Sequence, residues 1–157
     1  MSEPPNELLQ TLMRSQGGTA FIQALGAEIT RAEAGKSTMR LPYSPFIVGN
    51  PDTGVVHGGV ITALLDHACG MAVGSALGAA ILDASRRSTT SYATLDLRID
   101  YMRAAKPGAD IFVAAECVKI TRQIVFARGR AFQESEDDPI ATATGAFMMT
   151  ELRSAEA

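Results

Sequence analysis

The sequence predicts an α+β domain in which one long apolar helix covers an antiparallel sheet. Two observations lead to this prediction. Apolar residues recur at three- and four-residue steps from Gly58 to about Leu77 and extend around much of the helix, which is typical of a buried helix. After this helix, four runs of strand-forming residues follow one another with turn residues between them, which is typical of an antiparallel meander.

The predicted strands lie on both sides of this helix in the sequence. Their ranges are 26–33 and 36–42 before the helix and 94–101, 110–119, 123–133 and 140–150 after it. Residues 43–56 are expected to form a loop and residues 79–92 a linker. Long strands with unpaired edges tend to associate, so we expect two subunits to join edge to edge.

The segment before the first strand is expected to be helical. Apolar residues between Glu7 and Leu25 are spaced for one helical face, and the pair Gly17-Gly18 divides the segment into two short helices. The chain is therefore predicted to consist of an N-terminal helical segment, residues 1–25, and a single domain, residues 26–157. Its 157 residues are enough to bury one hydrophobic core.

Composition excludes several classes of protein. A net charge of −3, a pI near 5.4 and the lack of a basic patch argue against a nucleic-acid partner. The apolar stretch Ala68–Leu82 contains three glycines and is bracketed by Asp66 and Asp83, so we expect no membrane span. The N-terminus lacks the features of a signal peptide, and Cys69 and Cys117 fit reduced thiols. We therefore expect a cytoplasmic protein.

The junction of loop and helix at Gly58 has the features of an oxyanion site. Backbone N–H groups at a helix start lack partners inside the helix and lie at its positive end. Gly58 and Gly59 have no side chain to keep a carbonyl away from these donors. The alternative is that the glycine pair only makes a tight turn. Asn50 could donate a second hydrogen bond or stabilise the loop, and His57 could contact substrate or, as we expect, hold the loop.

Asp66 is a carboxylate inside an apolar helix, where an unpaired charge is costly. It either takes part in chemistry or lies on a polar edge of the helix. Asp66 follows Gly58 by eight residues, so it lies roughly 12 Å farther along the helix axis. That distance is too great for attack on a carbonyl held at the start of the same helix. If both groups serve one reaction, they must come from two subunits with antiparallel helices.

Three groups of residues carry a family resemblance. They are Asn50, Gly54, His57-Gly58-Gly59 and Leu65-Asp66; Gly70; and Tyr101-Met102 with Lys106-Pro107-Gly108. From about residue 26 to the C-terminus, the chain resembles the phenylacetate-pathway (PaaI-like) type of hot-dog acyl-CoA thioesterase. The resemblance implies a hot-dog fold, in which a sheet wraps around one central helix. It also implies edge-to-edge homodimers that usually pair into homotetramers.

The resemblance implies a role for each residue of the first motif. Asn50 and the N–H of Gly58, together with Gly59, would polarise the carbonyl of an acyl-CoA substrate. Asp66 of the partner subunit would act as general base on water or as nucleophile. The reaction would release a carboxylic acid and free CoA.

Two further positions match the family at single residues. Thr94 matches a hydroxyl, often serine, that orients the attacking water in some members. The alternation of Leu95 and Leu97 places Thr94 on the opposite face of its strand, so a plain strand threonine is the alternative. Arg122 matches a basic position and would contact a CoA phosphate.

Other chemistries lack their motifs. The chain has no Gly-x-Ser-x-Gly, His-Glu-x-x-His or Cys-x-x-Cys, which leaves acyl transfer to water without metal or cofactor. Two alternatives to hydrolysis stay open. One is a hot-dog enoyl-thioester hydratase or dehydratase that pairs His57 with Asp66, and the other is a non-catalytic acyl-CoA binding protein.

Overall fold

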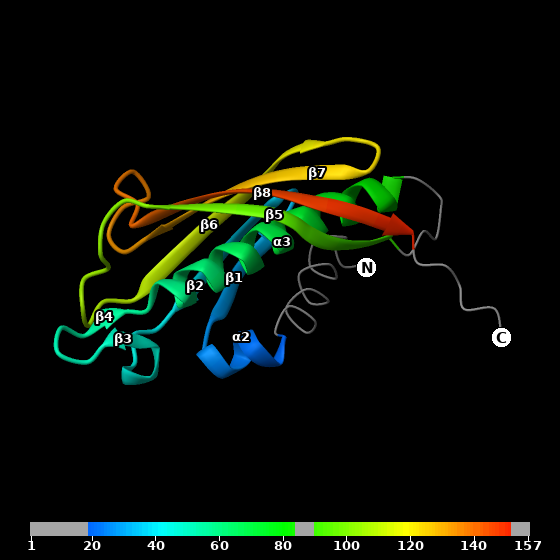
Figure 1. Cartoon of the computed structure of the whole chain (residues 1–157). Coiled ribbons are helices and arrows are strands. Elements are labelled where there is room, and N and C mark those ends of the chain that lie inside the picture. Colours follow the sequence, from blue (N-terminus) through cyan, green and yellow to red (C-terminus); the bar gives the residue numbers. More distant parts are fainter. Residues whose placement is uncertain (1–18, 84–89, 152–157) are drawn as a thin grey trace.

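The computed structural model describes residues 19–83 and 90–151, and six antiparallel strands form its main sheet (Figure 1). The strand order is β1-β2-β6-β7-β8-β5. The strands are β1 (Glu28–Glu33), β2 (Lys36–Leu41), β5 (Thr90–Tyr101), β6 (Ile111–Ile120), β7 (Ile124–Phe132) and β8 (Ala141–Glu151). All six predicted strands are present. The first of the two predicted N-terminal helices lies outside the described residues.

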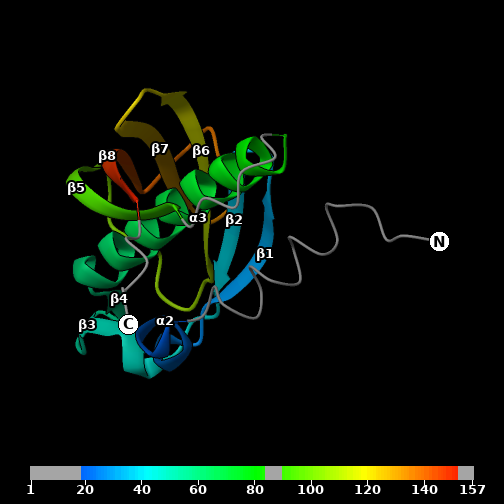
Figure 2. The same ribbon diagram turned by 90° about the vertical axis from the view of Figure 1, so that its right-hand side faces the viewer.

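One long helix, α3 (Gly58–Asp83), lies in the curve of the sheet and contacts all six strands (Figure 2). The helix is longer than predicted and the linker is shorter, because residues 79–83 are helical and residues 90–92 begin β5. By length and composition alone, the segment Gly58–Gly78 could cross a membrane. Its packing explains the composition, because the helix forms the centre of the core, with Leu64, Leu65 and Ala68 fully buried.

Polar contacts and a glycine fix where α3 lies on the sheet. Ser37 Oγ donates to the carbonyl of Ala68 at 2.6 Å, and Ser75 Oγ accepts from the N–H of Gly35 at 3.0 Å. At Gly129, an added Cβ would lie 3.2 Å from both Cys69 Sγ and a Leu65 methyl carbon. The helix therefore approaches β7 more closely than a larger residue would allow.

The segment between β2 and α3 contains short elements where the sequence predicted only a loop. They are η1 (Pro45–Ile47), β3 (Val48–Asn50) and β4 (Val55–Val56), and β3 pairs with β4. Before β1, helix α2 (Ala20–Leu25) begins at Thr19, whose hydroxyl accepts from the N–H of Ile22, and ends at Gly26 in the left-handed conformation. This helix is the second of the two predicted N-terminal helices.

A β-bulge at Leu95 reverses the alternation of side chains along β5. Thr94 pairs with Phe147 and Asp96 with Ala146, so Leu95 has no partner of its own on β8. Leu95 is 54% exposed, whereas Leu97 packs against the core. The expectation that Leu95 shares the buried face is therefore wrong. Because of the extra residue, Thr94 and Leu97 both face α3.

Candidate active site

The first turn of α3 leaves one glycine N–H available. His57 Nδ1 accepts from the N–H of Gly59 at 2.9 Å, and the His57 carbonyl accepts from the N–H of Val60 at 3.0 Å. Within the described residues, the N–H of Gly58 has no hydrogen-bond acceptor. His57 thus holds the start of the helix through two hydrogen bonds. The Gly59 N–H is not free to serve as a second donor, because His57 occupies it.

Asn50 lies beside this helix start at the end of β3. Its Oδ1 accepts from the N–H of Asp52 at 3.0 Å, which stabilises the following turn. Its Nδ2 donates to no acceptor in residues 19–83 and 90–151. An added Cβ on Gly49 would lie 2.8 Å from Cα of His57, so β3 runs directly against the start of α3. One Asn50 side chain can therefore both brace the loop and offer a donor.

Asp66 lies two turns farther along α3 and faces β5. Thr94 Oγ1 donates to Asp66 Oδ1 at 3.0 Å. A hydroxyl has a single proton, so this bond fixes the Thr94 rotor and leaves its lone pairs able to accept from water. Asp66 forms no ion pair with any Lys or Arg of the described chain. Among the described residues, Asp66 Oδ2 has no hydrogen-bond donor.

Asp66 opens onto a cleft of about 330 Å³ between α3, β5 and β8. The residues around it are Thr19, Asp66, His67, Gly70, Met71, Tyr92, Ala93, Thr94 and Phe147. Tyr92 and Phe147 pack edge to face with centroids 6.5 Å apart, and burial raises the pKa of the Tyr92 phenol. The wall beyond the carboxylate is therefore aromatic and apolar, which suits a hydrocarbon group.

Within one chain, the two halves of the predicted site stay apart. The cleft beside Asp66 includes Thr94 but none of Asn50, His57 or Gly58. This agrees with the axial separation expected from the helix rise. Arg122 lies exposed in the turn between β6 and β7, outside the cleft and without an ion pair among the described residues.

Sequence reasoning missed the contacts that residues of strands β5 and β8 make at the helix and the cleft. Tyr101 donates its hydroxyl to the carbonyl of Gly58 at 2.6 Å. Tyr92 and Phe147 form the cleft wall although 55 residues separate them in the chain. No local pattern marks these contacts, because they depend on which strand lies over which turn of α3.

The comparison with known families agrees with this geometry. Residues 53–140, more than half of the chain, match the family model of the thioesterase superfamily. The chain belongs to this superfamily. The match covers Asp66, Gly58 and Thr94, and it confirms both the predicted hot-dog fold and the predicted class of thioester hydrolase.

Individual relatives resemble the thioesterase over most of its length. The medium/long-chain acyl-CoA thioesterase YigI of Escherichia coli is 32% identical over 133 residues, covering 82% of this chain and 84% of YigI. A crystal structure from Pseudomonas aeruginosa shares 41% identity and a TM-score of 0.71, covering 90% of this chain and 98% of that one. The phenylacetic acid degradation protein PaaI of Thermus thermophilus shares the fold. Its structure has a TM-score of 0.67 and 22% sequence identity, covering 83% of this chain and 98% of PaaI.

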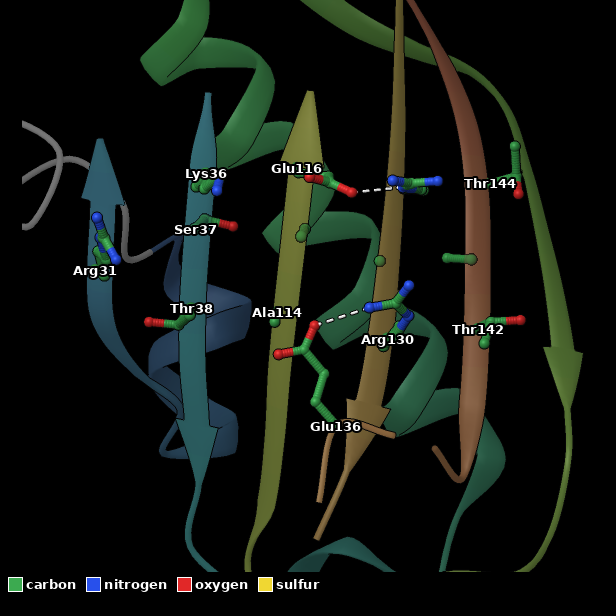
Figure 3. Close-up of a pocket in the computed structure, with 14 residues that line it drawn as sticks. Arg31, Lys36, Ser37, Thr38, Ala114, Glu116, Arg130, Glu136, Thr142 and Thr144 are labelled. Carbon is green, nitrogen blue, oxygen red and sulfur yellow. Dashed lines mark hydrogen bonds and ion pairs between the residues drawn. The ribbon is translucent and has the colours of Figure 1, made fainter. Parts of the chain in front are cut away.

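The thioesterase has a larger hollow, of about 470 Å³, on the face of the sheet that points away from α3 (Figure 3). Its central cations are neutralised by neighbouring acids. Arg128 pairs with Glu116 at 2.5 Å, and Arg130 pairs with Glu136 at 3.0 Å. None of the predicted site residues lines this hollow.

The described residues offer neither a metal site nor a reactive thiol. They contain no group of three or more His, Cys, Asp or Glu able to hold a metal ion. Burial, with a smaller contribution from the charge of Asp66, raises the pKa of the Cys69 thiol to about 12. A thiol of this kind is protonated at neutral pH and is a poor nucleophile.

Proposed function

We propose that this thioesterase hydrolyses acyl-CoA or aryl-CoA to a carboxylic acid and free CoA, at a site built by two subunits of a homodimer. The observation that carries the proposal is the pairing of Asp66 with Thr94 at the mouth of an apolar cleft. The unoccupied N–H of Gly58 supplies the second half of the chemistry. The likeness to YigI, named as an acyl-CoA thioesterase, supports the same substrate class.

In the proposed mechanism, the donors at Gly58 and Asn50 first bind the substrate carbonyl, and Asp66 of the partner subunit then activates water. The Gly58 N–H, with Asn50 Nδ2 beside it, donates to the thioester carbonyl oxygen and stabilises the negative charge that develops there. Asp66 of the partner subunit takes a proton from water, whose oxygen attacks the carbonyl carbon. The tetrahedral intermediate then expels the CoA sulfur, which receives the proton from that carboxyl group. Direct attack by Asp66, through an anhydride, remains the alternative chemistry.

The dimer is supported by strand β5. Among the strands of the described residues it forms an edge of the sheet, and β8 is its one neighbour there. Three apolar side chains at or next to this edge are more than half exposed: Leu95, Tyr101 and Met102. Antiparallel pairing of two β5 strands would bury such side chains and set the two α3 helices antiparallel. We further propose a homotetramer of two such dimers.

The remaining assignments belong to the same proposal. The exposed Arg122, which has no partner among the described residues, is proposed to meet a CoA phosphate. The enzyme is proposed to be cytoplasmic and to work without cofactor, metal, nucleic acid or membrane partner. The hydratase alternative is disfavoured because His57 Nδ1 is already the acceptor for Gly59.

Thiol release from a panel of acyl-CoA and aryl-CoA substrates tests the activity. Asp66→Asn should lower kcat about 10²- to 10⁴-fold, the usual contribution of a general base, while leaving the circular dichroism spectrum unchanged. Thr94→Val should lower kcat less, because the carboxyl group of Asp66 itself is retained. Substrate binding without thiol release from any panel member would instead favour the non-catalytic binder.

Mixed dimers test whether the site is shared. Gly58→Pro removes the proposed donor at the first position of a helix, where proline is favoured. If the halves come from two subunits, co-refolding two inactive variants, Gly58→Pro and Asp66→Asn, restores about a quarter of wild-type activity, since half of random dimers hold one intact site. A mixture as inactive as its parents would contradict the shared site.

A further inference from the structure

We infer that Tyr101 is a positioning residue. By binding the carbonyl of Gly58, it holds the peptide between Gly58 and Gly59 and so fixes the direction of the Gly58 N–H. This inference rests on the proposed function of Gly58. Three oxygen atoms meet at the start of α3. Tyr101 Oη lies 2.6 Å from the carbonyl oxygen of Gly58 and 2.6 Å from Thr62 Oγ1, and Thr62 Oγ1 lies 3.3 Å from the same carbonyl.

The positions of the protons follow from these contacts. A carbonyl can only accept, so the single proton of the Tyr101 hydroxyl goes to Gly58 O. The Tyr101 oxygen can then only accept from Thr62, whose single proton is shared between Tyr101 Oη at 2.6 Å and the Gly58 carbonyl at 3.3 Å. Thr62 therefore orients the Tyr101 hydroxyl, and Tyr101 holds the Gly58 carbonyl.

The two glycine peptides need such contacts because glycine restrains its own backbone least. The peptide between Gly58 and Gly59 is held at both ends, its carbonyl by Tyr101 and its N–H by His57 Nδ1. The peptide before it, between His57 and Gly58, is held by the bond from Val60 N–H to the His57 carbonyl. Its N–H, on Gly58, is left as a donor in a fixed direction. An oxyanion donor is effective because it is oriented before the charge appears.

Strand β5 thus forms hydrogen bonds with α3 at both proposed functional groups, the Asp66 carboxyl group and the Gly58 turn. Thr94, beside the bulge, bonds to Asp66, and Tyr101, at the end of the strand, bonds to the Gly58 turn. Although Tyr101 is 51% exposed, its hydroxyl is engaged on both sides. The strand that forms the sheet edge is therefore also the element that orients both functional groups.

Kinetics of Tyr101→Phe test the inference, because this change removes only the hydroxyl. Loss of a whole oxyanion donor lowers kcat about 10²- to 10³-fold. In Tyr101→Phe the Gly58 N–H is still present but less ordered, so kcat should fall only about tenfold. KM should change little. The matched control is Tyr43→Phe, which also removes a hydroxyl bond to a backbone carbonyl, that of Gly54 at 2.8 Å. It should lower the melting temperature similarly and change kcat less than about twofold.

A double-mutant cycle identifies the group through which Tyr101 acts. Gly58→Pro removes the donor and also places a Cβ 3.3 Å from Tyr101 Oη, so adding Tyr101→Phe in that background should leave kcat unchanged. A further tenfold loss in that background, or equal losses for Tyr101→Phe and Tyr43→Phe, would overturn the inference. Sedimentation of each variant verifies that the dimer is retained.

A measurement without substrate separates this inference from the proposed function. In protein labelled with ¹⁵N-glycine, Tyr101→Phe should shift or broaden the Gly58 and Gly59 amide signals, whereas Tyr43→Phe should leave both in place. If wild-type protein cleaves no thioester but these signals respond, the proposed function fails and the positioning contact stands. Unchanged signals in Tyr101→Phe would overturn the positioning role even in an active enzyme.

Discussion

Gly70 is expected to set the depth of the cleft beside Asp66. It lies on α3 one turn after the acid, and an added Cβ would meet Tyr92 Cε2 at 3.7 Å and Phe147 Cε1 at 3.8 Å. Both are ordinary van der Waals distances, so the methyl group of Gly70→Ala fits without displacing the aromatic wall. The substitution therefore narrows the space available to an acyl chain and leaves the fold intact.

Stability and activity should change in opposite directions in Gly70→Ala. Alanine inside a helix is more stable than glycine by about 0.5–1 kcal/mol. For a chain of this size, a gain of that amount raises the melting temperature by about 1–4 °C. The loss of room for about one methylene group removes about 0.8 kcal/mol of binding from the longest accommodated chain. This corresponds to about a fourfold fall in kcat/KM for that substrate.

The assay is kcat/KM across acyl-CoA substrates of increasing length, with the melting temperature measured on the same preparations. The optimum should move to chains one or two carbons shorter. Acetyl-CoA is the internal control, because its acyl group does not reach past Asp66, and its rate should be unchanged. A stabilised variant with an unaltered chain-length profile would refute the assignment of this cleft to the acyl group. An equal loss with every substrate would refute it as well.

Two further predictions follow from the titration of buried and paired groups. With the pKa of Cys69 raised to about 12, roughly one molecule in 10⁴ carries a thiolate there at pH 8, so mass spectrometry should find Cys69 unmodified by iodoacetamide in the native protein and modified after unfolding. The N–H of Tyr43 and the guanidinium of Arg40 lower the pKa of Asp110 below its ordinary value of 3.8, so the stability it contributes is full at neutral pH and is lost as pH falls below that value. Asp110→Asn should therefore lower the melting temperature more at pH 7 than at pH 3, and a pH-independent difference would show that Asp110 does not titrate as described.

The strands and the central helix could be predicted because their signals are local. Apolar residues at helical spacing from Gly58 onward, and runs of strand-forming residues between turns, report burial along a single element. The end of α3 was less predictable, since Gly78 and the small residues after it give little periodic signal. The two-stranded pair β3–β4 was missed because its strands are only two and three residues long.

The candidate site also has a part that local sequence predicts and a part that depends on how the strands pair. The set of Asn50, His57, Gly58 and Asp66 was predictable because it lies within 17 residues, and helix geometry alone separates its two halves. The part played by Thr94 was not predictable from alternation. A single bulge at Leu95 turns it towards Asp66, and a bulge shows only when two strands are paired.

By itself, the sequence predicted which residues could carry the proposed chemistry and that one helix holds them apart. A straight helix holds Gly58 and Asp66 two turns apart whatever surrounds it. Only the tertiary structure decided what orients those two groups: Thr94 and Tyr101 on β5, and His57 at the helix start. The physical reason is that β5 reaches the helix through the register of the sheet, and register depends on pairings between residues distant in the chain.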